Sequence, residues 1–170
     1  MDLTELLDRA EIHDVLMRYC RGVDRADMTI VREVFHDDAR IDFPDDVYVG
    51  TPEGFCAFLA KDLSLMVRSK HAVGSTMIDI DGDTARVEAY LTGDIESTQY
   101  HRWHGGFTTV WGRYIDRFEK RAGVWKISHH TLVLDCQRLD QTGGFFKVPE
   151  AQLGTRDGTD LAVTNDFTTD

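Results

Sequence analysis

"HAVGSTMIDIDGDTARVEAYLTGDIES", residues 71–97, decides the fold class of this chain. Its two halves are rich in apolar and β-branched residues, and they flank the turn sequence DGD at 81–83, which is a strong hairpin signal. A second pair of such segments, 107–121 and 124–140, flanks Ala-Gly at 122–123. The second half of the chain therefore predicts two long antiparallel hairpins.

Upstream of these hairpins, apolar residues recur with a helical period. The first helix is expected to start after a cap at Asp2 and to end at Gly22. A second, short helix is expected over 27–36 and a third over 52–67, with a short hairpin around Pro44 between them. Helices followed by an antiparallel sheet predict an α+β domain. If the long strands curl around the helices, they form a cone with a pocket inside.

The composition fits one domain over residues 1–142, followed by an irregular C-terminal tail over 143–170. Lys and Arg total 19 against 30 Asp and Glu, which gives a net charge of −11. So acidic a chain predicts no binding to nucleic acid or to anionic membranes. The three cysteines lack the spacing of a disulfide framework or a zinc site. No apolar run is long enough to span a membrane, so we expect a cytoplasmic protein.

Asp24 and His71 are the first candidates for a functional pair. Asp24 follows the first predicted helix and His71 opens the first long strand, so the two can meet across the mouth of a cone. Taken alone, each is more simply a surface or core residue. Together, a carboxylate that accepts from one ring nitrogen fixes the tautomer and raises the basicity of the other nitrogen. The combination predicts general-base chemistry.

Five segments carry a resemblance to a known family: RYCRGVDRADM (18–28), VFHDDARIDF (34–43), GTPEGFCAFL (50–59), KHAVGSTMIDIDGDTARVEAY (70–90) and GRYIDRFEKRAGVWKISHHTLVLD (112–135). Over roughly residues 4–140 the chain resembles the SnoaL-like branch of the nuclear transport factor 2-like superfamily. Its layout is similar to that of scytalone dehydratase, bile-acid 7α-dehydratase and hexachlorocyclohexane dehydrochlorinase. The resemblance implies a cone-shaped α+β barrel, with three N-terminal helices packed in a curved antiparallel sheet.

The resemblance also implies roles for individual residues. Asp24 and His71 match the catalytic Asp–His pair, and Tyr19 matches a tyrosine that the bile-acid enzyme places five residues before its aspartate. His130 stands where the dehydrochlorinase has an arginine on its last strand. A histidine stabilises a departing anion only when it is protonated or acts as a neutral donor. Loss of water or carbon–carbon cleavage is therefore favoured over loss of halide.

The resulting hypothesis is a cofactor-independent lyase of the dehydratase type, acting on an apolar, hydroxylated aromatic or polycyclic small molecule. His71 is the expected base, Asp24 orients it, and Tyr19 and His130 are candidate donors to the leaving group. The candidates for lining the substrate pocket are Tyr48, Phe55, Phe58, Tyr90, Trp111 and Arg113. No metal is expected, because HxxH at 101–104 and the other histidines lack a recognisable ligand spacing.

Other functions use the same parts. A ketosteroid-isomerase-like isomerase needs only a base and an oxyanion donor, and a polyketide cyclase or a non-catalytic binding or assembly module is also open, because fold alone does not decide function. Hydrogen-bond contact between Asp24 and His71 inside a pocket would favour an enzyme. A homo-oligomer, dimer or trimer, is expected because the last two long strands carry apolar residues on both faces.

Overall fold

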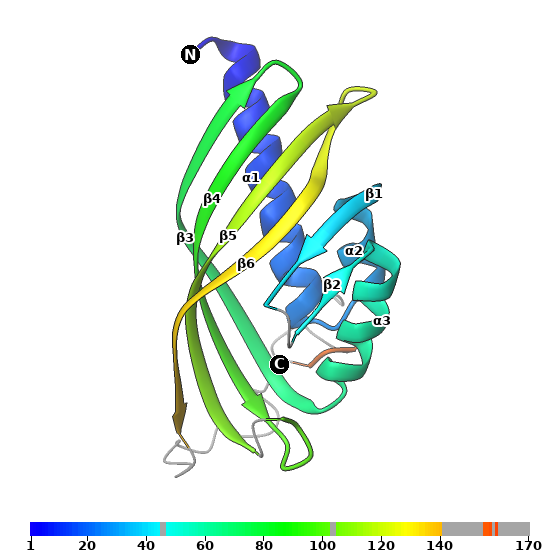
Figure 1. Ribbon diagram of the computed structural model, residues 1–170, viewed down its shortest axis with the longest axis vertical. Coiled ribbons are helices and arrows are strands. Elements are labelled where there is room, and N and C mark those ends of the chain that lie inside the picture. Colours follow the sequence, from blue (N-terminus) through cyan, green and yellow to red (C-terminus); the bar gives the residue numbers. More distant parts are fainter. Residues whose placement is uncertain (45–46, 103–104, 141–154, 158, 160–170) are drawn as a thin grey trace, which may run out of the picture.

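A computed structural model describes residues 1–44, 47–102, 105–140, 155–157 and 159 (Figure 1). The helices are α1 (Leu3–Asp24), α2 (Met28–Glu33) and α3 (Pro52–Leu63), and the strands are β1 (Phe35–Asp42), β2 (Val49–Gly50), β3 (Met66–Asp81), β4 (Thr84–Ser97), β5 (Gly106–Arg121) and β6 (Val124–Asp140). Most of the predicted tail over 143–170 lies outside the described residues. No helix in the described part of the chain combines the length and apolarity needed to cross a membrane.

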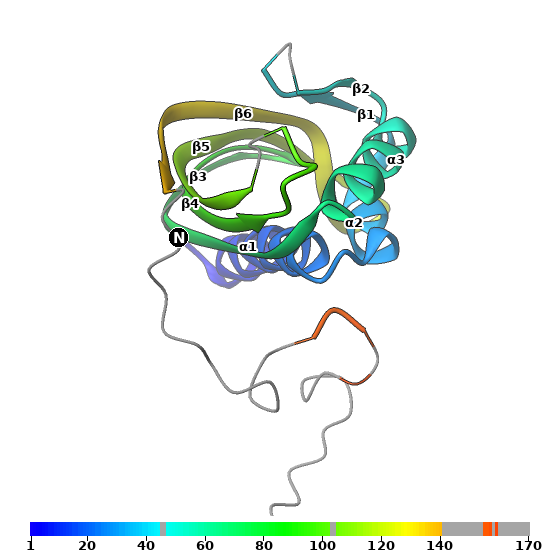
Figure 2. The ribbon, with the colours of Figure 1, turned by 90° about the horizontal axis from the view of Figure 1, so that it is seen from below.

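The strands form one six-stranded sheet in the order β2-β1-β6-β5-β4-β3. The strands β3 to β6 pair in antiparallel fashion, whereas β1 runs parallel to β6, so the sheet is mixed. Figure 2 shows the long strands curving around one side of the molecule, with α1 lying across the open side. The sheet does not close on itself. The predicted α+β fold of cone shape is confirmed.

The long strands place one face of the sheet against the helices. Along β4, buried residues alternate with more exposed ones, as expected for a strand with one face in the core. The core joins the concave face of the sheet to α1, α2 and α3, and its fully buried large side chains include Ile12, Leu16, Phe35, Phe55, Phe118, Trp125 and Ile127. The opposite face of the sheet is left to solvent.

The first helix continues through Gly22 and ends at Asp24, so the prediction that it ends at Gly22 is wrong. A Cβ atom at Gly22 would lie 2.8 Å from Val31 Cγ2 and 3.0 Å from the Val31 backbone nitrogen. The glycine therefore lets α1 and α2 approach closely. Asp24 lies on the last turn of a long helix, which fixes its position.

The other two helices are shorter than predicted. Phe35 already pairs with Ile127 in the sheet, and Met66 already pairs with Ser97. Strand pairing overrides the helical pattern at both places because each segment gains a neighbouring strand. His71 consequently lies inside β3, five residues after its start at Met66.

Candidate functional site

Asp24 and His71 are in direct contact. Oδ1 of Asp24 lies 2.6 Å from Nδ1 of the His71 ring, and the backbone N–H of His71 donates to Oδ2 of Asp24 at 2.8 Å. Both carboxylate oxygens are thus held by one residue. The two side chains are 21% and 13% exposed, so the pair is largely shielded from water but not sealed. With Nδ1 occupied by the carboxylate, Nε2 is the ring nitrogen left for chemistry.

The imidazole of His71 borders a cavity of about 140 Å³ between the sheet and the helices. The wall is mostly apolar and comes from α1, α3 and all four long strands, with Val23, Leu59, Leu63, Met66, Leu91, Ile95, Val110, Leu132 and Leu134 among its residues. Such a wall excludes water and leaves orientation to a few polar groups. The polar side chains that border it, besides His71, are Tyr19, Tyr114, Asp62, Arg102 and Gln137.

Tyr19 and Tyr114 border this cavity together. Each is only 2% exposed, and their rings meet edge to face with centroids 5.6 Å apart. Burial raises the pKa of both hydroxyls well above the usual tyrosine value. Both side chains therefore keep their protons at neutral pH and can donate hydrogen bonds to a bound molecule. Tyr114 was not singled out from the sequence.

His130 lies behind the two tyrosines and does not border the cavity. Its Nδ1 is 2.7 Å from Oδ1 of Asp116, which faces it across the β5–β6 pair, and both side chains are fully buried. The His130 ring contacts Tyr19 and Tyr114, with centroids 4.6 and 4.8 Å away. The His130 ring also contacts Phe43, 5.1 Å between centroids, and Phe43 borders the cavity. Any effect of His130 on a bound molecule therefore passes through neighbouring aromatic rings.

Three of the predicted pocket residues lie near α3. Phe58 borders the cavity directly. Tyr48 stacks on Phe58 at 5.6 Å and donates its hydroxyl to the carbonyl oxygen of Thr51, while Phe55 is fully buried in the core. Tyr48 and Phe55 thus support Phe58 from behind and do not face the cavity.

The other three predicted pocket residues lie on the outer face of the sheet, away from the cavity. Tyr90 is 50% and Trp111 is 38% exposed, and Arg113 forms ion pairs with Glu88 and Asp135. Side chains alternate between the two faces of a strand. In β4 and β5 the residues directly before and after these three point inward. The structure therefore does not bring these residues to the site.

A polar cluster borders the cavity where β4 leads into β5. Asp62 of α3 pairs with Arg102 at 3.0 Å, and Nε2 of the buried His101 lies 3.4 Å from the same carboxylate oxygen. The guanidinium of Arg102 also lies over the ring of Phe58, 5.7 Å from its centroid. No sequence pattern pointed to Asp62 or Arg102, because they are 40 residues apart.

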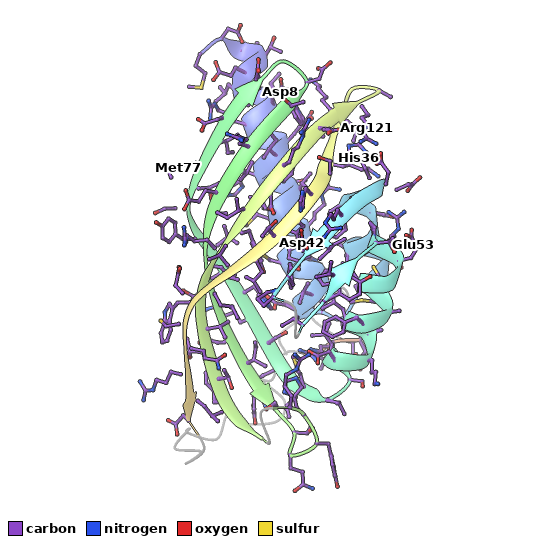
Figure 3. All side chains as sticks on the ribbon, in the orientation of Figure 1. Asp8, His36, Asp42, Glu53, Met77 and Arg121 are labelled. Atoms are coloured by element: carbon purple, nitrogen blue, oxygen red, sulfur yellow. The ribbon has the colours of Figure 1, made fainter. Side chains whose placement is uncertain are left out.

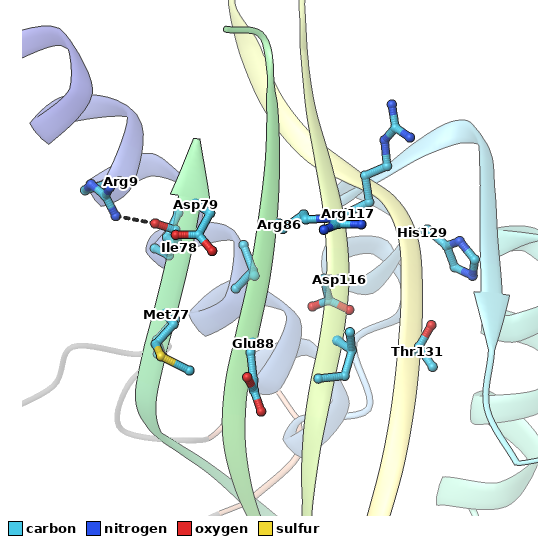
Figure 4. Close-up of a pocket in the computed structure, with 13 residues that line it drawn as sticks. Arg9, Met77, Ile78, Asp79, Arg86, Glu88, Asp116, Arg117, His129 and Thr131 are labelled. Carbon is cyan, nitrogen blue, oxygen red and sulfur yellow. Dashed lines mark hydrogen bonds between the residues drawn. The ribbon is translucent and has the colours of Figure 1, made fainter. Parts of the chain in front are cut away.

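A larger hollow of about 820 Å³ lies on the outer face of the sheet (Figure 4). Charged side chains border it, and Arg9 of α1 reaches its edge to donate to the carbonyl oxygen of Ile78. Its volume exceeds that of the inner cavity, but it is open, and neither residue of the Asp24–His71 pair borders it. We therefore place the candidate site in the inner cavity.

The described residues hold no group of three or more His, Cys, Asp or Glu side chains placed to bind a metal ion. The inner cavity is bordered by the Asp24–His71 pair, two protonated tyrosines, the Asp62–Arg102 ion pair and an apolar wall. This set can move a proton at a ligand atom and donate hydrogen bonds to a developing negative charge.

A curved, unclosed sheet packed against N-terminal helices, with a cavity between them, defines the cone fold of the nuclear transport factor 2-like superfamily. Within that superfamily the chain belongs to the SnoaL-like family, whose domain model matches residues 4–131. No curated protein sequence matches the chain.

Solved structures share the fold at low sequence identity. Hexachlorocyclohexane dehydrochlorinase LinA-type3 from Novosphingobium barchaimii is 20% identical, with a TM-score of 0.74 over 88% of this chain and 99% of that one. A candidate scytalone dehydratase from Novosphingobium aromaticivorans is 17% identical, with a TM-score of 0.72 over 86% and 100%. The Kfla4162 protein from Kribbella flavida is 24% identical, with a TM-score of 0.70 over 79% and 95%. At these identities the likeness establishes the fold alone.

Proposed function

We propose that this protein is a cofactor-independent lyase that eliminates water from, or cleaves a carbon–carbon bond in, an apolar hydroxylated aromatic molecule. The observation that carries the proposal is the 2.6 Å contact between Nδ1 of His71 and Oδ1 of Asp24 at the wall of an apolar cavity. A binding module does not require a carboxylate that accepts hydrogen bonds from both the ring and the backbone of one histidine. A general base gains a fixed tautomer and a fixed direction.

The base in this proposal is Nε2 of His71. Asp24 accepts a hydrogen bond from Nδ1–H, so the lone pair of Nε2 is available to a ligand in the cavity. As Nε2 takes a proton, the ring becomes cationic, and the adjacent carboxylate stabilises that charge. The apolar wall strengthens this interaction because it lowers the local dielectric constant.

Elimination of water then needs one proton transfer in each direction. His71 removes a proton from the carbon next to the one that bears the hydroxyl, and the C–H electron pair forms the double bond. The C–O bond breaks, and the departing hydroxide takes up the proton that His71 gained, so water leaves and the base is regenerated. Tyr19 is a weak acid because burial raises its pKa, so its role is to donate a hydrogen bond to the departing oxygen. His130 supports Tyr19 through ring contact.

The size of the cavity narrows the substrate. A dry cavity of about 150 Å³ in another protein accepts benzene, and the cavity beside His71 is of similar size, about 140 Å³. This favours a compact molecule with a single aromatic ring over a polycyclic one.

Double-bond isomerisation is the second candidate, and the pairing of Tyr19 with Tyr114 favours it. Two protonated hydroxyl groups at one wall can stabilise the oxyanion of an enolate while His71 moves a proton between two carbons. In this reaction no group leaves. Product analysis by mass distinguishes it from dehydration, which lowers the mass of the substrate by that of one water.

The base can be tested with 5-nitrobenzisoxazole, a small aromatic probe that opens to a coloured phenolate when a base removes its ring proton. His71→Ala and Asp24→Asn should each lower the rate of ring opening by about 10²–10⁴-fold. His129→Ala is the matched control, because this neighbouring histidine is 42% exposed and does not border the inner cavity. Ring opening by His71→Ala at the wild-type rate would refute the base. Binding of the probe by the wild type without ring opening would support a binding module.

A further inference from the structure

Arg156, in the C-terminal segment, makes four hydrogen bonds to the part of the fold that carries the Asp24–His71 pair. Nε donates to the carbonyl oxygen of Asp24 at 3.0 Å, and Nη1 donates to the carbonyl oxygens of Leu63 and Met66, each at 3.2 Å. Nη2 donates to Oγ of Ser69 at 2.9 Å. All three nitrogens of the guanidinium group are therefore used.

These acceptors belong to three different elements. Asp24 and Leu63 are the last residues of α1 and α3, and Met66 begins β3, which carries Ser69 two residues before His71. In Figure 2 the described C-terminal segment, coloured orange, lies beyond α1, on the side of the helices. One side chain from the far end of the chain thus joins the element of the carboxylate to the element of the imidazole.

The chemistry of these contacts suits a guanidinium group. The last carbonyl groups of a helix have no partner within the helix and carry partial negative charge. Two such helix ends, α1 and α3, meet at Arg156. A planar group with five N–H donors can satisfy several acceptors at once, whereas a lysine ammonium has three.

A second contact anchors the same segment. Nη1 of Arg25, which caps the end of α1, donates to the carbonyl oxygen of Thr155 at 2.6 Å. The next residue, Asp157, accepts from the backbone N–H of Thr159 at 2.8 Å. The guanidinium is thus delivered by a segment that is itself bonded to α1.

We propose that Arg156 is a positioning residue for the Asp24–His71 pair: it locks the ends of α1 and α3 to the start of β3 and thereby holds the carboxylate at hydrogen-bond distance from the imidazole. Its effect on turnover rests on the proposed function, but its effect on the geometry of the pair does not. The pair spans α1 and β3, and hydrogen bonds weaken steeply with distance and angle. A small shift of either element is therefore enough to break the contact.

The test compares Arg156→Met and Arg156→Lys with Arg21→Met. Arg21 lies in the same last turn of α1 and is exposed, so its replacement removes the same charge from the same helix end without touching the four acceptors. The first readout is the low-field proton NMR signal of His71 Nδ1–H, assigned by its loss in His71→Ala. The second is the rate of 5-nitrobenzisoxazole ring opening, separated into kcat and KM.

We expect Arg156→Met to lose or broaden the low-field signal and to lower kcat by about 10- to 100-fold with little change in KM. Arg156→Lys should lie between Arg156→Met and the wild type, and Arg21→Met should match the wild type. A lower melting temperature with an unchanged signal and kcat would show that Arg156 only adds stability, and would overturn the proposal. If Arg156→Met does not fold, Arg156→Lys serves in its place. A folded Arg156→Lys with the wild-type low-field signal and the wild-type kcat would also overturn the proposal.

The results for Arg156→Met and His71→Ala together distinguish the positioning role of Arg156 from the role of His71 as the base. Loss of the signal in Arg156→Met, together with full activity in His71→Ala, would keep the positioning role and reject His71 as the base. An intact signal and rate in Arg156→Met, together with an inactive His71→Ala, would keep the base and reject the positioning role.

Discussion

Gly93 lies directly opposite His71 in the pairing of β3 with β4. A Cβ atom at this position would lie 3.7 Å from Nε2 of His71 and 2.8 Å from Cγ2 of Val110. The backbone of Gly93 does not have the positive φ that favours glycine. The close approach of Val110, and not backbone conformation, therefore explains the glycine, and an added methyl group would lie in contact with the imidazole.

Gly93→Ala should lower the rate of 5-nitrobenzisoxazole ring opening by roughly tenfold or more, because the methyl group occupies space next to Nε2. Its contact with Val110 should also destabilise the fold, by about 1–3 kcal/mol. Gly74→Ala is the control, since the nearest atom to a Cβ there is 4.0 Å away. Kinetics and urea unfolding of both variants check this. A wild-type rate in Gly93→Ala would show that Nε2 does not use this space.

Tyr19→Phe removes one hydroxyl group from the cavity and leaves the base intact. We expect a smaller loss of rate than for His71→Ala, about tenfold, because one hydrogen bond to the developing negative charge is lost. Tyr114→Phe is the matched comparison and shows which hydroxyl faces the reacting oxygen. Because burial raises the pKa of both tyrosines, ultraviolet titration should show two phenols that ionise above the usual pH of about 10. Equal rates for both variants and the wild type would contradict a donor role.

Much of the architecture could be predicted because its signals are local. The turn at 81–83 holds Gly82 at a φ of +58°, and the second turn holds Ala122 and Gly123 at +51° and +83°, as tight hairpins require. Asp27 and Thr51 cap α2 and α3 with their side chains. Each of these features depends only on residues that are neighbours in the sequence, so the sequence alone predicts it.

Features that depend on contacts between distant segments could not be predicted in the same way. Gly22 resembles a helix end, and only the packing of α2 shows that it is an interior contact. The direction of β1 was equally hidden, because its parallel pairing with β6 joins segments about ninety residues apart.

For the site, the sequence placed Asp24 and His71 at segment ends that could meet, and they do meet. In β5 both faces carry large apolar side chains, so the sequence does not decide which face points inward. In β4 the apolar residues alternate with charged ones, and Tyr90 lies on the charged, outward face. The prediction that Tyr90 and Trp111 line the pocket is wrong, because both side chains lie on the outer face of the sheet. The partner of His130 was hidden as well, since Asp116 is found only once the β5–β6 register is known.

Asp8 lies near the N-terminal end of α1 (Figure 3), and we expect its carboxylate to stabilise the fold in a pH-dependent way. Lys120 and the indole of Trp125 donate to its Oδ1 at 2.7 and 2.9 Å, and these hydrogen bonds lower the pKa of the Asp8 carboxyl. When folding lowers the pKa of a carboxyl, its ionised form stabilises the folded protein at pH values above the pKa of the unfolded state, about 3.9. This contribution is lost as the pH falls through the pKa of the folded state.

Asp8→Asn should therefore be less stable than the wild type at pH 7, and the difference should shrink as the pH falls below about 4. Urea unfolding across this range measures it. Asp14→Asn is the control, because the Asp14 side chain is 66% exposed in its pair with Arg18. A difference that does not depend on pH would mean that the charge of Asp8 is not what stabilises the fold.

The outer face of the sheet exposes several large apolar side chains. Met77 is 57%, Tyr90 50%, Trp111 38% and Ile115 38% exposed, and these side chains come from three adjacent strands. Figure 3 shows Met77 projecting from β3 away from the helices. Large apolar side chains that gather on one face of a soluble protein mark a contact surface. We therefore expect the chain to form a dimer or trimer through this face.

Light scattering on a sizing column, at about 1–100 μM protein, should show the oligomer for the wild type. Trp111→Glu should dissociate it, because burying an unpaired carboxylate in an apolar contact costs several kcal/mol. Val124→Glu is the matched control: Val124 is 52% exposed but starts β6 at the hairpin turn, away from the centre of the face. A stable wild-type monomer at these concentrations would refute the contact. An oligomer that survives Trp111→Glu but not Val124→Glu would move it to the end of the sheet.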